Sequence, residues 1–197
     1  MKTLKSTRLL SAGLLLLAAC GYGQGQDLPA PKPDTDIAKD KGLAAVQDAS
    51  KSGKYFFIFF FKVEDDATAQ DRKVFDETLA KVADRAASLA INIAKEPEAG
   101  LVKKYRVANA PMPLVLALAP NGAVTSGLRS GFDEKGLMAA FASPGMEKSL
   151  KALQDGKLVL ICVQNKSTQS NAAAMQGVNE LKADPKLGST TEVITVD

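Results

Sequence analysis

Residues 55–61 of this chain read YFFIFFF, and this short stretch decides the fold. It is the most apolar run outside the N-terminal segment, and it holds five of the eight phenylalanines. Because it is short, bounded by turn residues and not alternating, it predicts a central strand that is buried on both faces. An aromatic ligand site is the alternative, but the length and the pattern favour the core.

Helical and extended patterns alternate around this strand. A helix is expected at 37–50, and a second helix follows the acidic residues 64–66 and runs to about Arg85, because apolar residues recur there at helical spacing. Further along, we expect a strand at 89–93, a short helix from 96, a strand at 114–118, a hairpin strand at 123–128 and a helix at 133–142. The predicted order is therefore helix, β-α-β, helix, β-β, helix.

This order resembles that of thioredoxin. The resemblance covers residues 37–142 and rests on YFFIFFF at 55–61, FDE at 75–77, LAINI at 89–93, KYRVANAP at 104–111 and NG at 121–122. It implies an α/β fold at 37–143, a three-layer sandwich in which helices flank a central mixed sheet. The segment KYRVANAP is similar to the family's K-Y-x-V-x-x-x-P, which puts Pro111 at the family's cis-proline; the extra Pro113 departs from that pattern.

The redox motif of the family is missing. In this alignment Asp65-Asp66-Ala67-Thr68 takes the place of Cys-x-x-Cys. Disulfide exchange needs one thiolate to attack and a second to resolve the mixed disulfide, and no cysteine lies between Cys20 and Cys162. The resemblance still implies a surface that binds peptides, with candidate contacts at Asp65, Asp66, Thr68, Ala110, Pro111 and Met112.

Residues 144–197 repeat the first half of the domain. GK at 156–157 precedes LVLICV at 158–163, as GK at 53–54 precedes the first strand. A helix at about 171–182 and a strand at 192–196 complete a helix-β-α-β half-unit at an offset of 103 residues. Because a central strand would end this half-unit unpaired, we expect the chain to be a fragment of a longer protein. Alternatively, these elements extend or cover the first sheet.

The N-terminus has the pattern of a bacterial lipoprotein signal. Basic residues precede an apolar run of 11 residues, too short to span a bilayer, which ends in small residues before Cys20. The resemblance implies a signal peptide at 1–19, lipid attachment at Cys20 and a membrane anchor. Residues 20–36 are rich in Gly, Gln and Pro and predict a flexible tether. Gly21 favours the periplasmic side of the outer membrane if the source has two membranes.

Composition narrows the possible functions. Removal of the signal takes three of the 25 basic residues, which leaves 22 against 22 acidic ones, so nothing suggests a nucleic-acid partner. The chain has no histidine, which excludes Ser-His-Asp catalysis and histidine-ligated metal sites. The acidic residues 64–66 fit no calcium loop, so we expect no metal and no cofactor.

We therefore expect a lipid-anchored envelope protein that is not an enzyme and that binds a protein or peptide through its thioredoxin-like domain. Two alternatives remain open. One is a thiol oxidoreductase or peroxidase that acts through Cys162, although its apolar neighbours indicate a small buried side chain. The other is a purely structural envelope lipoprotein without a specific partner.

Overall fold

The computed structural model describes residues 41–96, 99–165, 167 and 169–196. The signal peptide expected at 1–19, the lipid attachment expected at Cys20 and the tether expected at 20–36 lie outside these residues. None of the described helices combines the length and the apolar character that crossing a bilayer requires.

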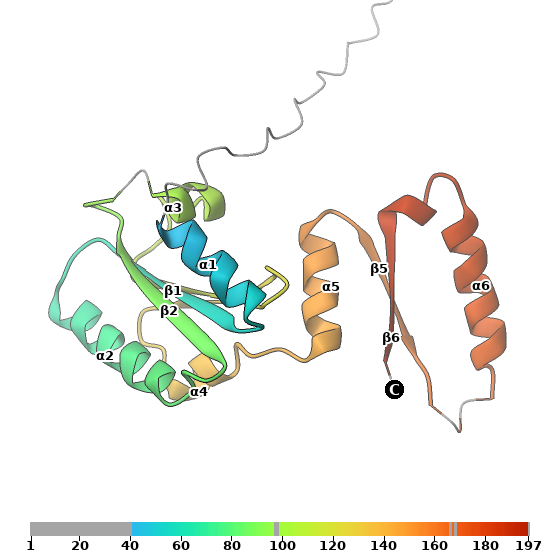
Figure 1. The fold of residues 1–197 in the computed structure, drawn as a ribbon, viewed down its shortest axis with the longest axis horizontal. Coiled ribbons are helices and arrows are strands. Elements are labelled where there is room, and N and C mark those ends of the chain that lie inside the picture. The colour runs from blue at the N-terminus through green and yellow to red at the C-terminus, as the bar shows by residue number, and fades with distance from the viewer. Residues whose placement is uncertain (1–40, 97–98, 166, 168, 197) are drawn as a thin grey trace, which may run out of the picture. The chain divides into compact units, whose positions relative to one another are not determined.

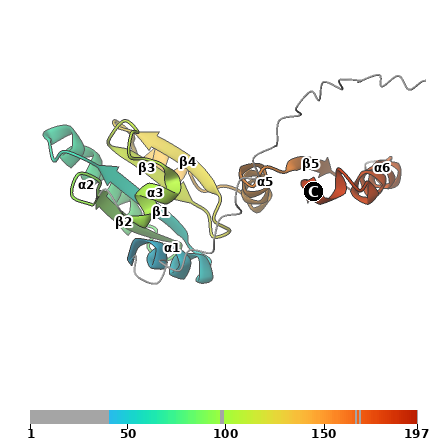
Figure 2. The same cartoon turned by 90° about the horizontal axis from the view of Figure 1, so that it is seen from above.

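A four-stranded mixed sheet forms the centre of the first domain, with its strands in the order β2-β1-β3-β4 (Figure 2). β1 (Tyr55–Phe61) lies parallel to β2 (Ala86–Asn92) and antiparallel to β3 (Leu114–Leu118). β3 in turn pairs antiparallel with β4 (Val124–Arg129). The predicted strand at 114–118 is thus present with the same bounds.

β1 is enclosed along both edges and on both faces. Ile58 lies opposite Leu89 on one side and Leu116 on the other. The side chains from Phe57 to Phe60 are fully buried, with 0% exposure. The prediction of a central strand covered on both faces is therefore confirmed, and the phenylalanines belong to the core.

Helices cover both faces of the sheet (Figure 1). α1 (Lys41–Lys51) and α3 (Gly100–Tyr105) pack on one face, together with Phe56, Ile58 and Phe60 of β1. α2 (Asp66–Ala80) and α4 (Glu134–Met138) pack on the other face, with the alternate side chains of β1. This arrangement is the expected α/β thioredoxin-like sandwich, because a strand that is apolar on both faces requires a helical layer above and below it.

The second helix is shorter than predicted. We expected it to continue to about Arg85, but α2 ends at Ala80 and the residues that follow form a turn before β2. Val82 lies in this turn and is nevertheless buried in the core. Its helical spacing from Leu79 therefore reflects packing and not a continuing helix.

The C-terminal part consists of α5 (Pro144–Gln154), β5 (Leu158–Val163), α6 (Asn171–Ala183), a 3-10 turn (Gly188–Thr190) and β6 (Thr191–Val196). The two strands pair in parallel as a separate two-stranded sheet and lie between α5 and α6 in Figure 1. The alternative that these strands extend the first sheet is therefore wrong. The element order helix-β-α-β is the one expected.

The strand registers differ from the constant offset of 103 residues that was predicted. Tyr55 and Leu158 begin the first strands of the two parts and lie 103 residues apart. Their parallel partners, Ala86 and Thr191, lie 105 residues apart. The offset of 103 residues therefore does not hold for the second strand. Because side chains alternate with a period of two, this difference of two residues leaves the same faces of the strands aligned.

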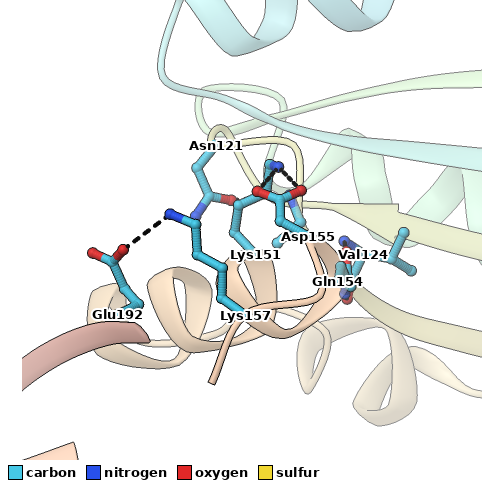
Figure 3. A network of polar contacts seen from close by, with 8 residues as sticks. Asn121, Val124, Lys151, Gln154, Asp155, Lys157 and Glu192 are labelled. Atoms are coloured by element: carbon cyan, nitrogen blue, oxygen red, sulfur yellow. Dashed lines mark hydrogen bonds and ion pairs between the residues drawn. The ribbon is translucent and has the colours of Figure 1, made fainter. Parts of the chain in front are cut away.

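α5 is joined to the first domain by polar contacts at both of its ends. The side-chain amide of Gln154 accepts from the Val124 N–H (2.9 Å) and donates to the Val124 carbonyl (2.8 Å), so it pairs with the start of β4 (Figure 3). Near the other end, the Tyr55 hydroxyl donates to Glu147 (2.6 Å) and accepts from the Ala142 N–H (2.9 Å). Burial and the bond to Glu147 raise the pKa of Tyr55 to about 12.

The burial of β1 predicts a large cost for removing one of its side chains. Ile58→Ala should lower the free energy of unfolding by about 2–5 kcal/mol, because it leaves a cavity in the packed core. Val63→Ala, at a side chain that is 64% exposed, should change it by less than about 0.5 kcal/mol. Urea denaturation followed by circular dichroism measures both. Equal effects of the two substitutions would contradict the burial described here.

Candidate functional site

The two segments predicted to bind a peptide meet at one end of the first sheet. β1 ends at Phe61, and β3 begins at Leu114, which lies opposite Phe60 in the antiparallel register. The loop that follows β1 and the loop that precedes β3 are therefore neighbours. The structure brings the Asp65–Thr68 segment and the Ala110–Met112 loop to the same sheet end, as the sequence predicted.

Two of the predicted contact residues in the first segment serve the start of α2. Asp65 is the N-cap, and its carboxylate accepts from the Thr68 N–H at 2.8 Å. Thr68 is itself buried, with 7% exposure, so its side chain does not face a partner. Asp66 is exposed and makes no ion pair or side-chain hydrogen bond within the described residues. Of the predicted polar contacts, Asp66 alone presents a side chain that is both exposed and uncommitted.

The capping contact also affects how Asp65 titrates. The backbone N–H of Thr68, followed by its hydroxyl, lowers the pKa of this carboxyl below its ordinary value of 3.8. The ionised form is therefore the form that the folded chain favours. Asp65 therefore serves the helix start, and its contact with a bound peptide stays a prediction.

The second segment differs from the prediction at its proline. The cis peptide bond of the described residues joins Met112 to Pro113, so the assignment of Pro111 to the cis-proline position is wrong. The distance from Tyr105 pointed to Pro111, but the buried proline is the residue that directly precedes β3. Pro111 is exposed, whereas Ala110 and Met112 are half-buried and pack against the core on the α1 and α3 side.

The Met112 backbone is available at this sheet end. Ala110 donates its N–H to the Val107 carbonyl (3.0 Å), which closes the turn before the loop. In contrast, the N–H and C=O of Met112 make no hydrogen bond within the described residues. Because Met112 is half-buried, water only partly satisfies its N–H and C=O groups. The backbone of a bound peptide could form hydrogen bonds with both groups.

Val63 is a residue of this sheet end that the sequence reasoning missed. It lies in the loop after β1, and its side chain is 64% exposed. Continuing the antiparallel register by two residues beyond Phe60 and Leu114 places Lys62 beside Met112, so Val63 lies close to that loop. The available signal was a single valine inside an otherwise charged segment, which reads KVEDD at 62–66.

A buried carboxylate in α2 was also not predicted as a structural residue. Asp71 is 5% exposed and accepts from the Ser130 hydroxyl (2.7 Å) and the Gly131 N–H (3.1 Å). These bonds tie α2 to the turn that follows β4. Asp71 is therefore committed to the fold, and no described group of three or more His, Cys, Asp or Glu side chains is placed to hold a metal ion.

An open hollow of about 480 Å³ lies between the middle of α2 and the second half of β2. Its lining includes four charged side chains, which are Glu64, Arg72, Lys95 and Glu96. Arg72 pairs with Asp76 at 2.8 Å, and Lys95 pairs with Glu64 at 3.6 Å. Because these charges largely neutralise one another, the hollow gives less support to a ligand site than the opposite side of the loop after β1.

Cys162 lies far along the chain from this sheet end. It is a free cysteine within β5, opposite Thr195 of β6, and it is half-buried where the prediction was a buried side chain. Its sequence neighbours Ile161 and Val163 are 58% and 68% exposed, so the buried packing role expected for Cys162 is not confirmed.

Comparison with known proteins gives a likeness of fold. No protein-family model matches the chain, and no curated protein matches it. Among solved structures, the oxidised thioredoxin of Plasmodium falciparum is 10% identical, with a TM-score of 0.38 over 54% of this chain and 91% of that one. The mitochondrial thioredoxin 3 of Saccharomyces cerevisiae is 14% identical, with a TM-score of 0.38 over 55% and 88%.

A structure with two domains also matches. The first two thioredoxin domains of Naumovozyma dairenensis Eps1p are 11% identical, with a TM-score of 0.36 over 87% of this chain and 74% of that one. At these identities and TM-scores the likeness carries no argument about function. The assignment of the fold rests on the strand order and register described above.

The capping role of Asp65 predicts a pH dependence. Because folding lowers its pKa, the carboxylate stabilises the fold above its ordinary value of 3.8, and this contribution is lost as the pH falls through the lowered pKa. In Asp65→Asn the cap still accepts a hydrogen bond but no longer titrates. The urea midpoint of this variant should fall less than that of the wild type between pH 7 and pH values below 3.8.

Asp66→Asn is the matched control, because Asp66 lies one residue away and caps nothing. It should follow the pH dependence of the wild type more closely than Asp65→Asn does. Identical acid profiles for Asp65→Asn and the wild type would show that the cap does not contribute in this way.

Proposed function

We propose that this chain is a lipid-anchored protein of the cell envelope whose first domain binds a protein or peptide and does not catalyse thiol–disulfide exchange. The observation that supports the proposal is that the Asp65–Thr68 segment follows β1 and the Ala110–Met112 loop precedes β3 at the sheet end where these two strands pair. Neither segment contains a cysteine. What remains there is a recognition surface without the two thiols that exchange requires.

The backbone at this end supports recognition of an extended segment. The N–H and C=O of Met112 are not used within the described residues and lie just before β3 begins. An extended peptide can pair with such a residue as it would with the edge of a sheet, and main-chain bonds of this kind provide affinity for many sequences. The partner is therefore expected to bind as a strand-like segment.

The side chains around Met112 indicate which segments are preferred. Val63 and Pro111 are exposed apolar groups beside it, and they would contact an apolar side chain of the partner. Asp66 adds an exposed carboxylate whose charge favours a nearby lysine, arginine or free amino group. We therefore expect extended segments that combine apolar and basic residues.

The membrane anchor rests on the sequence. Residues 1–20 have the basic start, the short apolar run and the small residues before Cys20 that resemble a lipoprotein signal. Attachment through several acyl chains binds a membrane far more strongly than a single chain does. The tether expected at 20–36 would then hold the binding domain away from the bilayer surface.

A displayed library of random peptides, selected on the purified full-length chain, tests the binding function. Val63→Glu should weaken the binding of the selected peptides at least about tenfold, because it puts a charge on the apolar part of the surface. Asp66→Lys should weaken the binding of the basic peptides among them, because like charges then repel each other. Fluorescence anisotropy with labelled peptides measures each affinity.

Val163→Glu is the matched control, since Val163 is 68% exposed and lies in β5, outside this sheet end. It should leave the peptide affinities unchanged. The proposal fails if no peptide is selected, or if Val63→Glu and Asp66→Lys both bind as the wild type does.

The anchor predicts a dependence on a single cysteine. In a bacterial host fed with labelled palmitate, the wild type should be labelled and should sediment with the membranes, whereas Cys20→Ala should take up no label. Cys162→Ala is the control and should remain labelled, because Cys162 lies in a strand of the folded part. Label on Cys20→Ala would rule out lipid attachment at that residue.

A further inference from the structure

One edge of β5 has no strand beside it within the described part of the chain. β5 pairs with β6 along its other edge, from Leu158 opposite Thr191 to Val163 opposite Val196. The corresponding strand of the first domain, β1, is paired on both edges. There, β3 runs antiparallel along the edge that β5 leaves open.

The hydrogen bonds of β5 identify the backbone groups on this open edge. The Gln164 N–H donates to the Val196 carbonyl at 2.9 Å, so Gln164 and every second residue before it face β6. Val159, Ile161 and Val163 therefore direct their N–H and C=O groups away from β6. Within the described residues, these three present six unpaired backbone groups along an edge that can accept a strand.

Equivalent side chains of β1 and β5 differ strongly in burial. Ile58 and Phe60 are 0% exposed, whereas Ile161 and Val163, which follow them by 103 residues, are 58% and 68% exposed. Leu158 points to the opposite face of β5 and is 56% exposed. β5 thus has the sequence of a central strand, but large apolar side chains remain uncovered on both of its faces.

The outer edge of the first sheet is protected, and the edge of β5 is not. The Gln154 amide pairs with the backbone of Val124 at the start of β4 (Figure 3). The exposed Arg129 ends that strand. Charges and covering groups of this kind prevent pairing between chains. The segment 158–163 has no charge and no proline, and its register with β6 has no bulge.

We infer that a second copy of this chain covers the open edge, with the two β5 strands antiparallel about a two-fold axis. The occupant must be a strand that is apolar on both faces, because β5 exposes apolar side chains on both. Among the described strands, β5 is the one that combines six apolar residues with an unpaired edge. A two-fold axis places this same surface on both sides of the contact.

The backbone directions determine the register of the pair. In an antiparallel pair, outward-facing residues exchange hydrogen bonds with outward-facing residues of the other strand. A two-fold axis at Ile161 lets the three outward-facing residues of each copy form hydrogen bonds, with Ile161 opposite Ile161 and Val163 opposite Val159. Lys157 then lies opposite Asn165, so no like charges face each other. The result is a four-stranded sheet in the order β6-β5-β5-β6.

Placing charges at Ile161, on the two-fold axis, tests this contact. The full-length chain is purified in excess detergent, and sedimentation velocity measures how much of it is dimeric. One six-residue edge makes a small interface, so the wild type should form dimers at roughly micromolar or higher concentrations. Ile161→Lys and Ile161→Glu each place like charges directly opposite each other and should weaken the dimer at least about tenfold. An equimolar mixture of the two variants should restore it.

Val63→Lys and Val63→Glu are the matched controls, because Val63 is similarly exposed but lies outside β5, and both should dimerise as the wild type does. Circular dichroism confirms that each variant is folded. Val163→Lys mixed with Val159→Glu provides a second pair, because these two positions lie opposite each other in this register. A wild type that stays monomeric up to about 100 µM overturns the inference. A dimer whose affinity does not change when residue 161 is charged also overturns it. The same holds if the equimolar mixture of the two variants does not form the dimer again. Peptide binding is measured separately, so either proposal can fail without the other.

Discussion

The structure depends on the need to enclose one strand, β1, whose seven residues are apolar or aromatic. A strand of this kind cannot leave a face or an edge in water without exposing large apolar area and unpaired backbone groups. β2 and β3 cover its edges, and helices cover both faces, so its central side chains are fully buried. The layers of the domain follow from this single requirement.

The same requirement explains the difference between the two parts of the chain. β5 has the apolar character of β1, and α5, α6 and β6 stand in the same order around it as α1, α2 and β2 stand around β1. The second part lacks a counterpart of β3 among the described residues, so one edge and portions of both faces of β5 stay uncovered. Within the described residues, the second part therefore leaves an apolar edge open, which we propose as an association surface, whereas the first part has a closed core.

The candidate binding surface arises where the closed core ends. Antiparallel pairing of β1 and β3 brings the end of one strand beside the start of the other, so two loops distant in sequence become neighbours. In this chain the capping of α2 occupies Asp65 and Thr68. The groups that remain for the proposed recognition are the Met112 backbone, Val63 and Asp66, none of which supports thiol chemistry.

The sequence by itself determined the central strand, the order of the elements in the first domain and the absence of paired cysteines, because these follow from local apolar pattern and from residue inventory. It predicted β3 and β5 with the bounds that they have. Tertiary structure decided that α2 ends at Ala80 although Val82 continues its apolar spacing, and that the cis peptide bond precedes Pro113 instead of Pro111. It also decided that Gln154 pairs with β4. These features depend on which residues meet across the sheet, and spacing along the chain does not contain that information.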